Sequence, residues 1–268
     1  MPKLAVENDR ELHFEMHTGA KRPVVLIHGW GACTRVWDTV TAALTDAGHT
    51  VVCYDQRACG QSDKDFAAND VTVGIEDAVK LIEHLELDGV ALNGWSLGGA
   101  VAVGAAHVLG PRCAGVVLTG GATPRYVKAD DFPHGGEPDA VAQTVAALRA
   151  DRPAFLWQLA TAVCAREPAD GINDWLRSIF WQTSPVADAA LASLAELDQR
   201  AELASLQMPV LSMIGTEDTF VDPAIGRLAA DIAPKGRCSE YEGIGHAPFL
   251  EAAERYRREL LEFVAGLG

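Results

Sequence analysis

Short runs of apolar residues alternate with helix-like segments along most of the chain, and this alternation limits the fold more than any other feature of the sequence. The runs lie at residues 24–27, 51–54, 90–92, 116–118 and 210–214. Segments between them, such as residues 36–47 and 75–85, carry apolar residues three and four positions apart, the spacing of one helix face. Strands that alternate with helices predict a parallel sheet covered by helices on both faces.

The two ends of the chain extend this pattern. Residues 4–17 alternate between polar and apolar around Asn8-Asp9, which predicts a β-hairpin. After the run at residues 210–214, the sequence predicts a helix at residues 223–232, a strand at residues 238–241 and a last helix that carries Ala252, Tyr256, Leu260 and Phe263.

Residues 123–206 interrupt the alternation, because strand-like runs are absent there. Helical segments are separated in this stretch by Pro133, Pro138, Pro153, Pro168 and Pro185. We expect residues 123–206 to form a helical cap inserted into a single domain, with residues 1–122 and 207–268 as its core.

The motif Gly94-Trp95-Ser96-Leu97-Gly98 lies between a predicted strand and a predicted helix. In a G-x-S-x-G motif the serine occupies a tight strand-to-helix turn that exposes its hydroxyl above the sheet, and the glycines let the flanking backbone approach closely. The helix N-terminus also favours the negative charge that develops during attack on a carbonyl. Ser96 is therefore the candidate nucleophile.

A serine hydroxyl needs a general base, and after this motif an acid and then a histidine follow along the chain. His246 is the candidate base because, of the eight histidines, it alone lies just after the last predicted strand, between glycines and Pro248. Asp218, which follows the strand at residues 210–214, is the candidate acid, and Glu217 and Asp222 are its rivals.

The oxyanion formed during ester cleavage needs two backbone N–H donors. The amide of Leu97, directly after the serine, is one candidate, and the amide of Trp30 in the loop His28-Gly29-Trp30-Gly31 is the other. We expect His28 to hold this loop in shape. Trp30 and Trp95 are expected to line the substrate pocket, because both lie close to the nucleophile or its oxyanion loop.

The balance of charge excludes several classes of partner. With 22 basic and 37 acidic residues the net charge is −15, so we expect neither nucleic acid nor an anionic membrane to bind. The N-terminus lacks the apolar core of a signal peptide, and no apolar run reaches the roughly 18 residues that a membrane span needs. Six cysteines without paired spacing are read as free thiols of a cytoplasmic protein.

The sequence offers no cluster that would hold a metal and no motif for a cofactor, so we expect neither. A small-molecule ester is the expected substrate. The sequence leaves open whether the chain forms a homo-oligomer.

These motifs together resemble the α/β-hydrolase superfamily over essentially the full length of the chain. Residues 28–31, 94–99, 214–223 and 243–249 occur in the order typical of that family, and residues 55–62 resemble its D-x-R-G-x-G-x-S turn, with Ala58 in place of the usual glycine. The resemblance implies the α/β-hydrolase fold, with a mostly parallel eight-stranded sheet, helices on both faces and a helical cap insertion.

A closer resemblance is to the branch of bacterial arylesterases and cofactor-free haloperoxidases, through residues 118–124, 130–133 and 148–152. It implies a serine hydrolase that cleaves aryl or short-chain alkyl esters through an acyl-enzyme, with perhydrolysis as a side activity. Two features of the sequence depart from the branch. Trp95-Ser96-Leu97 stands where Phe-Ser-Met is usual, and Gly31 stands where perhydrolytic members tend to carry proline.

Residues 94–99 and 246–249 also resemble pimeloyl-carrier-protein methyl ester esterases. Such enzymes dock an acidic carrier, which a chain at −15 is poorly suited to do unless a local patch of cap arginines assists, namely Arg149, Arg152, Arg166 and Arg177. A hydrolase of C–C bonds or lactones would use the same triad. A ligand receptor on the same fold is the non-enzyme alternative, and slow turnover with a covalently held ligand would indicate it.

Overall fold

An eight-stranded sheet runs through the centre of the computed structural model, which describes residues 2–166, 168–169 and 171–268. The strand order is β1-β2-β4-β3-β5-β6-β7-β8. The strands are β1 (Lys3–Glu7), β2 (Arg10–His17), β3 (Lys21–Ile27), β4 (His49–Tyr54), β5 (Val90–Trp95), β6 (Cys113–Thr119), β7 (Val210–Gly215) and β8 (Gly236–Tyr241). β1 pairs antiparallel with β2 and β2 with β4, and every other pairing is parallel. The predicted mostly parallel eight-stranded sheet is confirmed.

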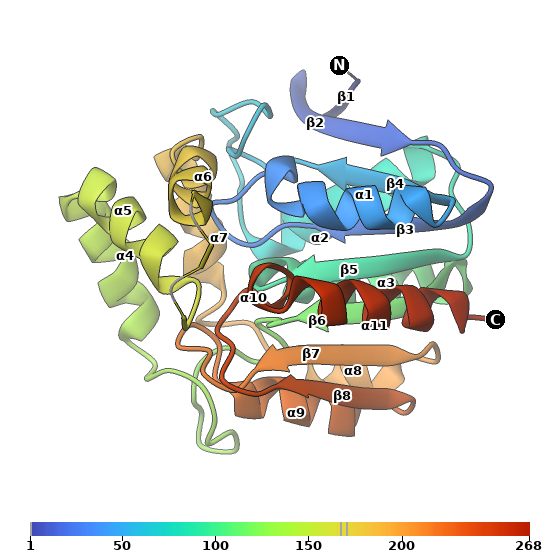
Figure 1. Cartoon of the computed structure of the whole chain (residues 1–268). Coiled ribbons are helices and arrows are strands. Elements are labelled where there is room, and N and C mark those ends of the chain that lie inside the picture. The colour runs from blue at the N-terminus through green and yellow to red at the C-terminus, as the bar shows by residue number, and fades with distance from the viewer. Residues whose placement is uncertain (1, 167, 170) are drawn as a thin grey trace.

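Helices cover both faces of this sheet (Figure 1). α1 (Asp38–Asp46) and α11 (Ala253–Ala265) lie on one face. α2 (Val71–His84), α3 (Leu97–Leu109), α8 (Arg200–Ser205) and α9 (Pro223–Ile232) lie on the other, where each contacts the next. The short helix α10 (Pro248–Glu251) precedes α11.

Small residues let α3 pack closely against both the sheet and the neighbouring helix α2. A Cβ at Gly104 would come within 2.2 Å of the side chain of Ile75 on α2, so the two helices approach more closely than a larger residue permits. The near-complete burial of α3 explains why its sequence is apolar all round rather than striped.

Two turns have the left-handed backbone that their sequences predict or tolerate. Asn8 and Asp9 join β1 to β2 with φ values of 39° and 67°, which these residue types adopt more readily than most. Ala58 has a φ of 64°, so the turn after β4 keeps the conformation that glycine favours although the residue is alanine.

A helical cap lies beyond the carboxyl ends of the parallel strands (Figure 1). It contains α4 (Ala140–Ala150), α5 (Arg152–Ala162), α6 (Ile172–Phe180) and α7 (Asp188–Ser193). A partly buried ion pair joins two of these helices, with Nη1 of Arg152 2.8 Å from Oδ1 of Asp188. α8, which ends the segment predicted as cap, instead packs on α3 and α9 beside the sheet.

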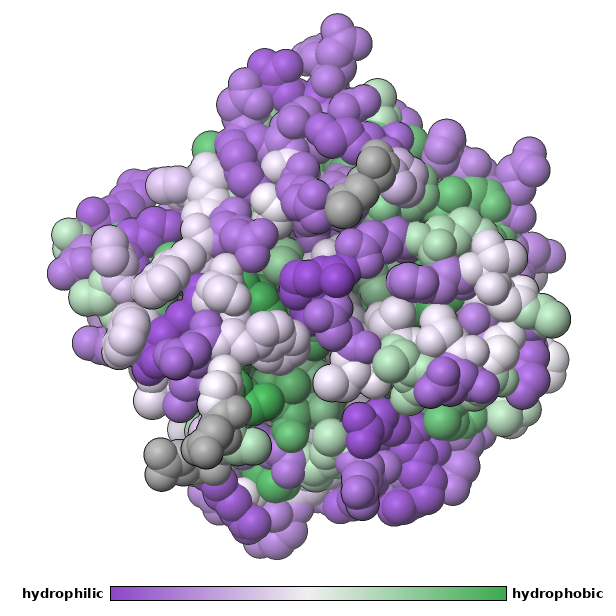
Figure 2. Space-filling view, turned by 45° about the horizontal axis from the view of Figure 1, so that its top comes forward, coloured by the Kyte–Doolittle hydropathy of each residue, from purple (hydrophilic) through white to green (hydrophobic). Residues whose placement is uncertain are grey.

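Figure 2 shows that one face of the molecule is covered mostly by hydrophilic residues, interrupted by small hydrophobic patches. Within the described part of the chain, no helix combines the length and the apolarity that crossing a membrane requires.

Candidate active site

Ser96 occupies the turn between β5 and α3, with a φ of 56° and a ψ of −122°. This left-handed conformation is strained for a residue with a side chain. The glycines of the motif make the turn sterically feasible, since a Cβ at Gly94 would lie 2.1 Å from the carbonyl oxygen of Gly98, and one at Gly98 would lie 2.4 Å from that of Ile27. The structure therefore has the tight strand-to-helix turn that the motif predicts.

His246 lies in the loop between β8 and α10, and its side chain meets Asp218, which follows β7. Nδ1 of His246 is 2.7 Å from Oδ2 of Asp218, and both side chains are buried. The other carboxylate oxygen, Oδ1, accepts hydrogen bonds from the backbone amides of Phe220 at 2.8 Å and Val221 at 3.0 Å. Because Asp218 is fixed by these amides, it holds the imidazole in one orientation, and no hydrogen bond joins Nε2 to another described residue.

The two rival acids have other positions. Glu217 is exposed. Asp222 caps α9 by accepting from the amide of Ala224 at 2.9 Å, and its second oxygen accepts from the amide of Gly135 in the cap segment at 3.1 Å. Of the three acids, Asp218 is the one that the structure brings to His246.

The imidazole is enclosed by groups that the sequence analysis did not single out for this purpose. The indole Nε1 of Trp95 donates to the carbonyl oxygen of His246 at 2.9 Å, and the ring of Phe220 lies 5.2 Å from the imidazole, centroid to centroid. Gly120, with a φ of +50°, passes so close that a Cβ there would lie 3.2 Å from both Oδ2 of Asp218 and Nδ1 of His246. The sequence feature that could have pointed to Gly120 is its position directly after the strand β6.

The two candidate oxyanion donors flank Ser96. A Cβ at Gly29 would lie 3.0 Å from the Cβ of Ser96, so the loop before Trp30 packs directly on the serine. Within the described residues, the amides of Trp30 and Leu97 donate no hydrogen bond to another protein group. Both residues line the same cavity as Ser96.

His28 is hydrogen-bonded within the loop at residues 28–31 and to the turn that follows β4. It is fully buried, and desolvation lowers its pKa, which favours the neutral imidazole. Its Nε2 accepts from the amide of Gln56 at 2.9 Å, so the proton lies on Nδ1, which donates to the carbonyl oxygen of Gly29 at 2.7 Å.

A cavity of about 620 Å³ lies above Ser96, between the sheet and the cap. Ser96, Asp218 and His246 line it, as do both of the tryptophans predicted for the pocket, Trp30 and Trp95. Its cap side is apolar, formed mainly by Phe155, Leu159, Val163, Phe180 and Leu191. No lysine or arginine is among its lining residues in the described part of the chain.

The tryptophans contribute unequally to this cavity. Trp30 is half-buried, and its Nε1 donates to the carbonyl oxygen of Ala187 at 2.9 Å. Trp95 is only 2% exposed, so it lies mostly beneath the histidine loop. Trp157 and Trp181 on the cap are 48% and 55% exposed and pack on each other at 6.2 Å, centroid to centroid, outside the cavity.

Tyr126 adds one hydroxyl to the apolar wall. Burial is the main cause that raises its pKa to about 12, so the phenol is a hydrogen-bond donor at neutral pH. Tyr126 lies in the segment that the Asp222–Gly135 hydrogen bond fastens to α9, since its carbonyl oxygen accepts from the amide of Gly136 at 3.3 Å.

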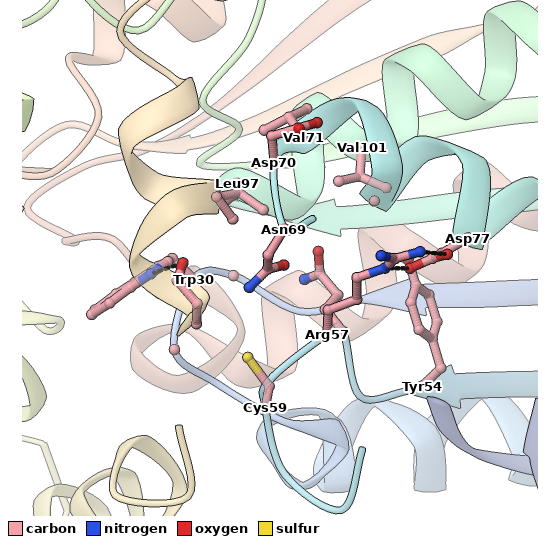
Figure 3. A pocket seen from close by; sticks show the side chains of 16 residues that line it. Trp30, Tyr54, Arg57, Cys59, Asn69, Asp70, Val71, Asp77, Leu97 and Val101 are labelled. Atoms are coloured by element: carbon pink, nitrogen blue, oxygen red, sulfur yellow. Dashed lines mark hydrogen bonds and ion pairs between the residues drawn. The ribbon is translucent and has the colours of Figure 1, made fainter. Parts of the chain in front are cut away.

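A second, much smaller chamber of about 20 Å³ lies behind Trp30 and Leu97 (Figure 3). One wall carries the buried pair of Arg57 and Asp77, whose Nε and Oδ2 atoms are 2.6 Å apart. The buried hydroxyl of Tyr54, also in the wall, has no hydrogen-bond partner among the described residues. The chamber has room for about one water molecule.

Within the described residues, no group of three or more histidine, cysteine, aspartate or glutamate side chains is placed to hold a metal ion.

Residues 22–253 match the family model for the alpha/beta hydrolase fold. The chain belongs to this family. Its curated relatives include the pimeloyl-[acyl-carrier protein] methyl ester esterase of Stenotrophomonas maltophilia, 32% identical over 96% of this chain and 97% of the relative. They also include the non-heme chloroperoxidase CPO-A1 of Kitasatospora aureofaciens, 29% identical over 92% and 93% of the two chains.

Among solved structures, an esterase from Exiguobacterium antarcticum superposes on this α/β hydrolase with a TM-score of 0.94. The two chains are 24% identical, and the match covers 98% of this chain and 99% of the other, which shows a shared fold. Both of the branches that the motifs resemble, the haloperoxidases and the carrier-protein methyl ester esterases, are thus represented among the relatives.

Proposed function

We propose that this α/β hydrolase is a serine hydrolase that cleaves small, uncharged carboxylic esters, aryl or short-chain alkyl, through an acyl-enzyme. Ser96 is the nucleophile, His246 the general base, and Asp218 the acid that orients the histidine. The amides of Trp30 and Leu97 form the oxyanion hole. The observation that carries the proposal is that the His246–Asp218 pair, joined at 2.7 Å, lines one cavity with Ser96 on its strained turn.

In the first half-reaction, Oγ of Ser96 attacks the carbonyl carbon of the ester while its proton passes to Nε2 of His246. The amides of Trp30 and Leu97 stabilise the oxyanion, and each such donor is worth about 2.7–4 kcal/mol. His246 then gives the proton to the leaving alcohol oxygen as the C–O bond breaks, and the acyl group stays on Ser96. A water molecule, deprotonated by His246, repeats the sequence and releases the carboxylic acid.

The cavity supports an uncharged substrate. Among the described residues that line it there is no lysine or arginine, so a carboxylate within it would lose hydration without gaining a lysine or arginine partner from them. The aromatic side chains of Trp30, Phe155, Phe180 and Phe220 favour aryl or compact apolar groups.

The carrier-protein methyl ester esterase activity is the second candidate, favoured by the 32% identity to a relative of that name. Two of the four cap arginines that could form a docking patch are already engaged. Arg152 pairs with Asp188, and Arg177 pairs with Asp174 at 2.6 Å while stacking on Trp157. Arg149 and Arg166 are exposed and could attract an acidic carrier. The net charge of −15 on the whole chain opposes this attraction, because it repels an acidic protein.

The test compares kcat/KM for phenyl acetate, ethyl butyrate, a C12 ester and a carrier-linked methyl ester. We expect phenyl acetate and ethyl butyrate to be the best substrates, with graded rather than absolute preferences, because apolar pockets discriminate by only about 1–3 kcal/mol per methylene. A carrier-linked ester preferred about a hundredfold, a difference of about 2.7 kcal/mol, would replace the proposal by the second candidate.

A further inference from the structure

Glu251, at the end of α10, is bonded to two segments that lie far apart in the sequence. Its Oε1 accepts from the amide of Gly245 at 2.8 Å, in the loop that carries His246. Its Oε2 accepts from the amides of Ala165 at 2.8 Å and Arg166 at 3.3 Å, in the cap. One carboxylate therefore joins the histidine loop to the cap.

The same two segments also touch directly. The amide of His246 donates to the carbonyl oxygen of Val163 at 2.9 Å. A Cβ at Gly245 would lie 2.5 Å from the nitrogen of Ala165, so the backbones are in close contact at the residue before the histidine. The peptide that leads into His246 is thus held by the cap on one side and by Glu251 on the other.

The cap segment at residues 163–166 continues from α5, whose inner face forms part of the cavity wall. Phe155 and Leu159 of α5, and Val163 just beyond it, all line the cavity above Ser96. The bonds to Glu251 and Val163 therefore link this wall to the histidine loop.

Backbone amides are the partners that the structure gives the Glu251 carboxylate. Among the described residues no lysine, arginine or histidine forms an ion pair with it, although the side chain is half-buried. Burial is the largest influence on its pKa and raises it, while the amide hydrogen bonds act in the opposite direction. A carboxylate has two acceptor oxygens, so it can accept hydrogen bonds from both segments at once. A glutamine side chain cannot do this, because its NH₂ group would face the N–H donor of one segment.

We propose that Glu251 is a positioning residue that fixes His246 against the cap wall of the cavity. The proposal rests on the function proposed for Ser96 and His246, and it adds that the cap sets the geometry of the base as well as the shape of the pocket. Glu251 does not contact the reacting atoms. Its effect on turnover passes through the backbone of Gly245 and His246.

The test is Glu251→Gln, with Glu259→Gln as the matched control. Glu259 is also a half-buried acid near the C-terminus, but its partners are Ser239, Tyr241 and Arg255, away from the cavity. Small misplacements of catalytic groups cost up to about 10²-fold in rate. For Glu251→Gln we expect kcat for phenyl acetate to fall by about 10- to 100-fold, with KM changed by less than about threefold.

Hydrogen–deuterium exchange supplies a second readout that does not depend on activity. In Glu251→Gln, amides at residues 163–166 and 243–247 should both exchange faster than in the wild type, and in Glu259→Gln neither should. The proposal is overturned if folded Glu251→Gln keeps kcat within about twofold of the wild type, if Glu259→Gln loses as much, or if only one segment exchanges faster. Retained activity in Ser96→Ala would instead refute the proposed function, so the two failures are distinguishable.

Discussion

Nδ1 of His246 lies 2.7 Å from Oδ2 of Asp218, and the second oxygen of that carboxylate is held by the backbone amides of Phe220 and Val221. The acid therefore cannot turn away from the histidine without losing two hydrogen bonds of its own. In the proposed mechanism, this arrangement makes Nε2 of His246 the nitrogen that receives the proton of Ser96, and it makes the choice of acid directly testable.

Asp218→Asn should leave the fold intact and lower kcat by about 10⁴-fold, because an amide in place of the carboxylate disfavours the tautomer of His246 that accepts a proton at Nε2. The measurement is kcat for phenyl acetate beside circular dichroism. Glu217→Gln is the neighbouring control, and since Glu217 is exposed it should keep wild-type activity. If Asp222→Asn lost most of its kcat and Asp218→Asn did not, the acid would be Asp222.

Gly120→Ala should reduce activity although residue 120 takes no part in the chemistry. The new Cβ would lie 3.2 Å from both Asp218 Oδ2 and His246 Nδ1, at a φ of +50° that alanine adopts only with strain. We expect kcat to fall by about 10²-fold. Gly171→Ala is a control for the backbone strain alone, because its φ is +85° and a Cβ there meets nothing within 4 Å. Equal activity in the two variants would show that Gly120 does not confine the pair.

Asp77→Ala should destabilise the fold without altering the chemistry of the site. Arg57 and Asp77 form a buried bidentate salt bridge, in which Nε of Arg57 is 2.6 Å from Oδ2 of Asp77 and Nη2 is 2.9 Å from Oδ1 (Figure 3). Removing one partner leaves a buried guanidinium without its main counter-ion, which costs about 3–5 kcal/mol of unfolding free energy. Urea denaturation measures this loss. A change below about 1 kcal/mol, the usual value of an exposed pair, would show that the pair is not buried in solution.

The sheet and the Ser96 turn were predictable because their signals are local. Strands buried on both faces read as apolar runs, and the turn needs glycine at positions 94 and 98, where a Cβ would strike backbone. His246 and Asp218 followed from their order along the chain after predicted strands. Sequence order alone could not separate Asp218 from Asp222, since that choice depends on which carboxylate points toward the histidine and which caps α9.

Contacts between distant segments were not predictable in the same way. Glu251 joins residues 245 and 165, and Gly120 makes room for a pair that lies about a hundred residues further along the chain. The orientation of the cap tryptophans was also not predictable from the sequence. Trp157 and Trp181 pack on each other at the surface, while Phe155 and Phe180 line the cavity, and helical spacing did not indicate which face of each helix turns inward.

Labelling by an organophosphate, read by mass spectrometry of proteolytic peptides, is the most direct test of whether Ser96 is the nucleophile. We expect one adduct, on Ser96, with activity lost in proportion to labelling. We also expect Ser96→Ala to form no adduct and to lose about 10⁶-fold in kcat, as in triads whose members act as a unit. An adduct on another residue, or near-normal turnover in Ser96→Ala, would contradict it.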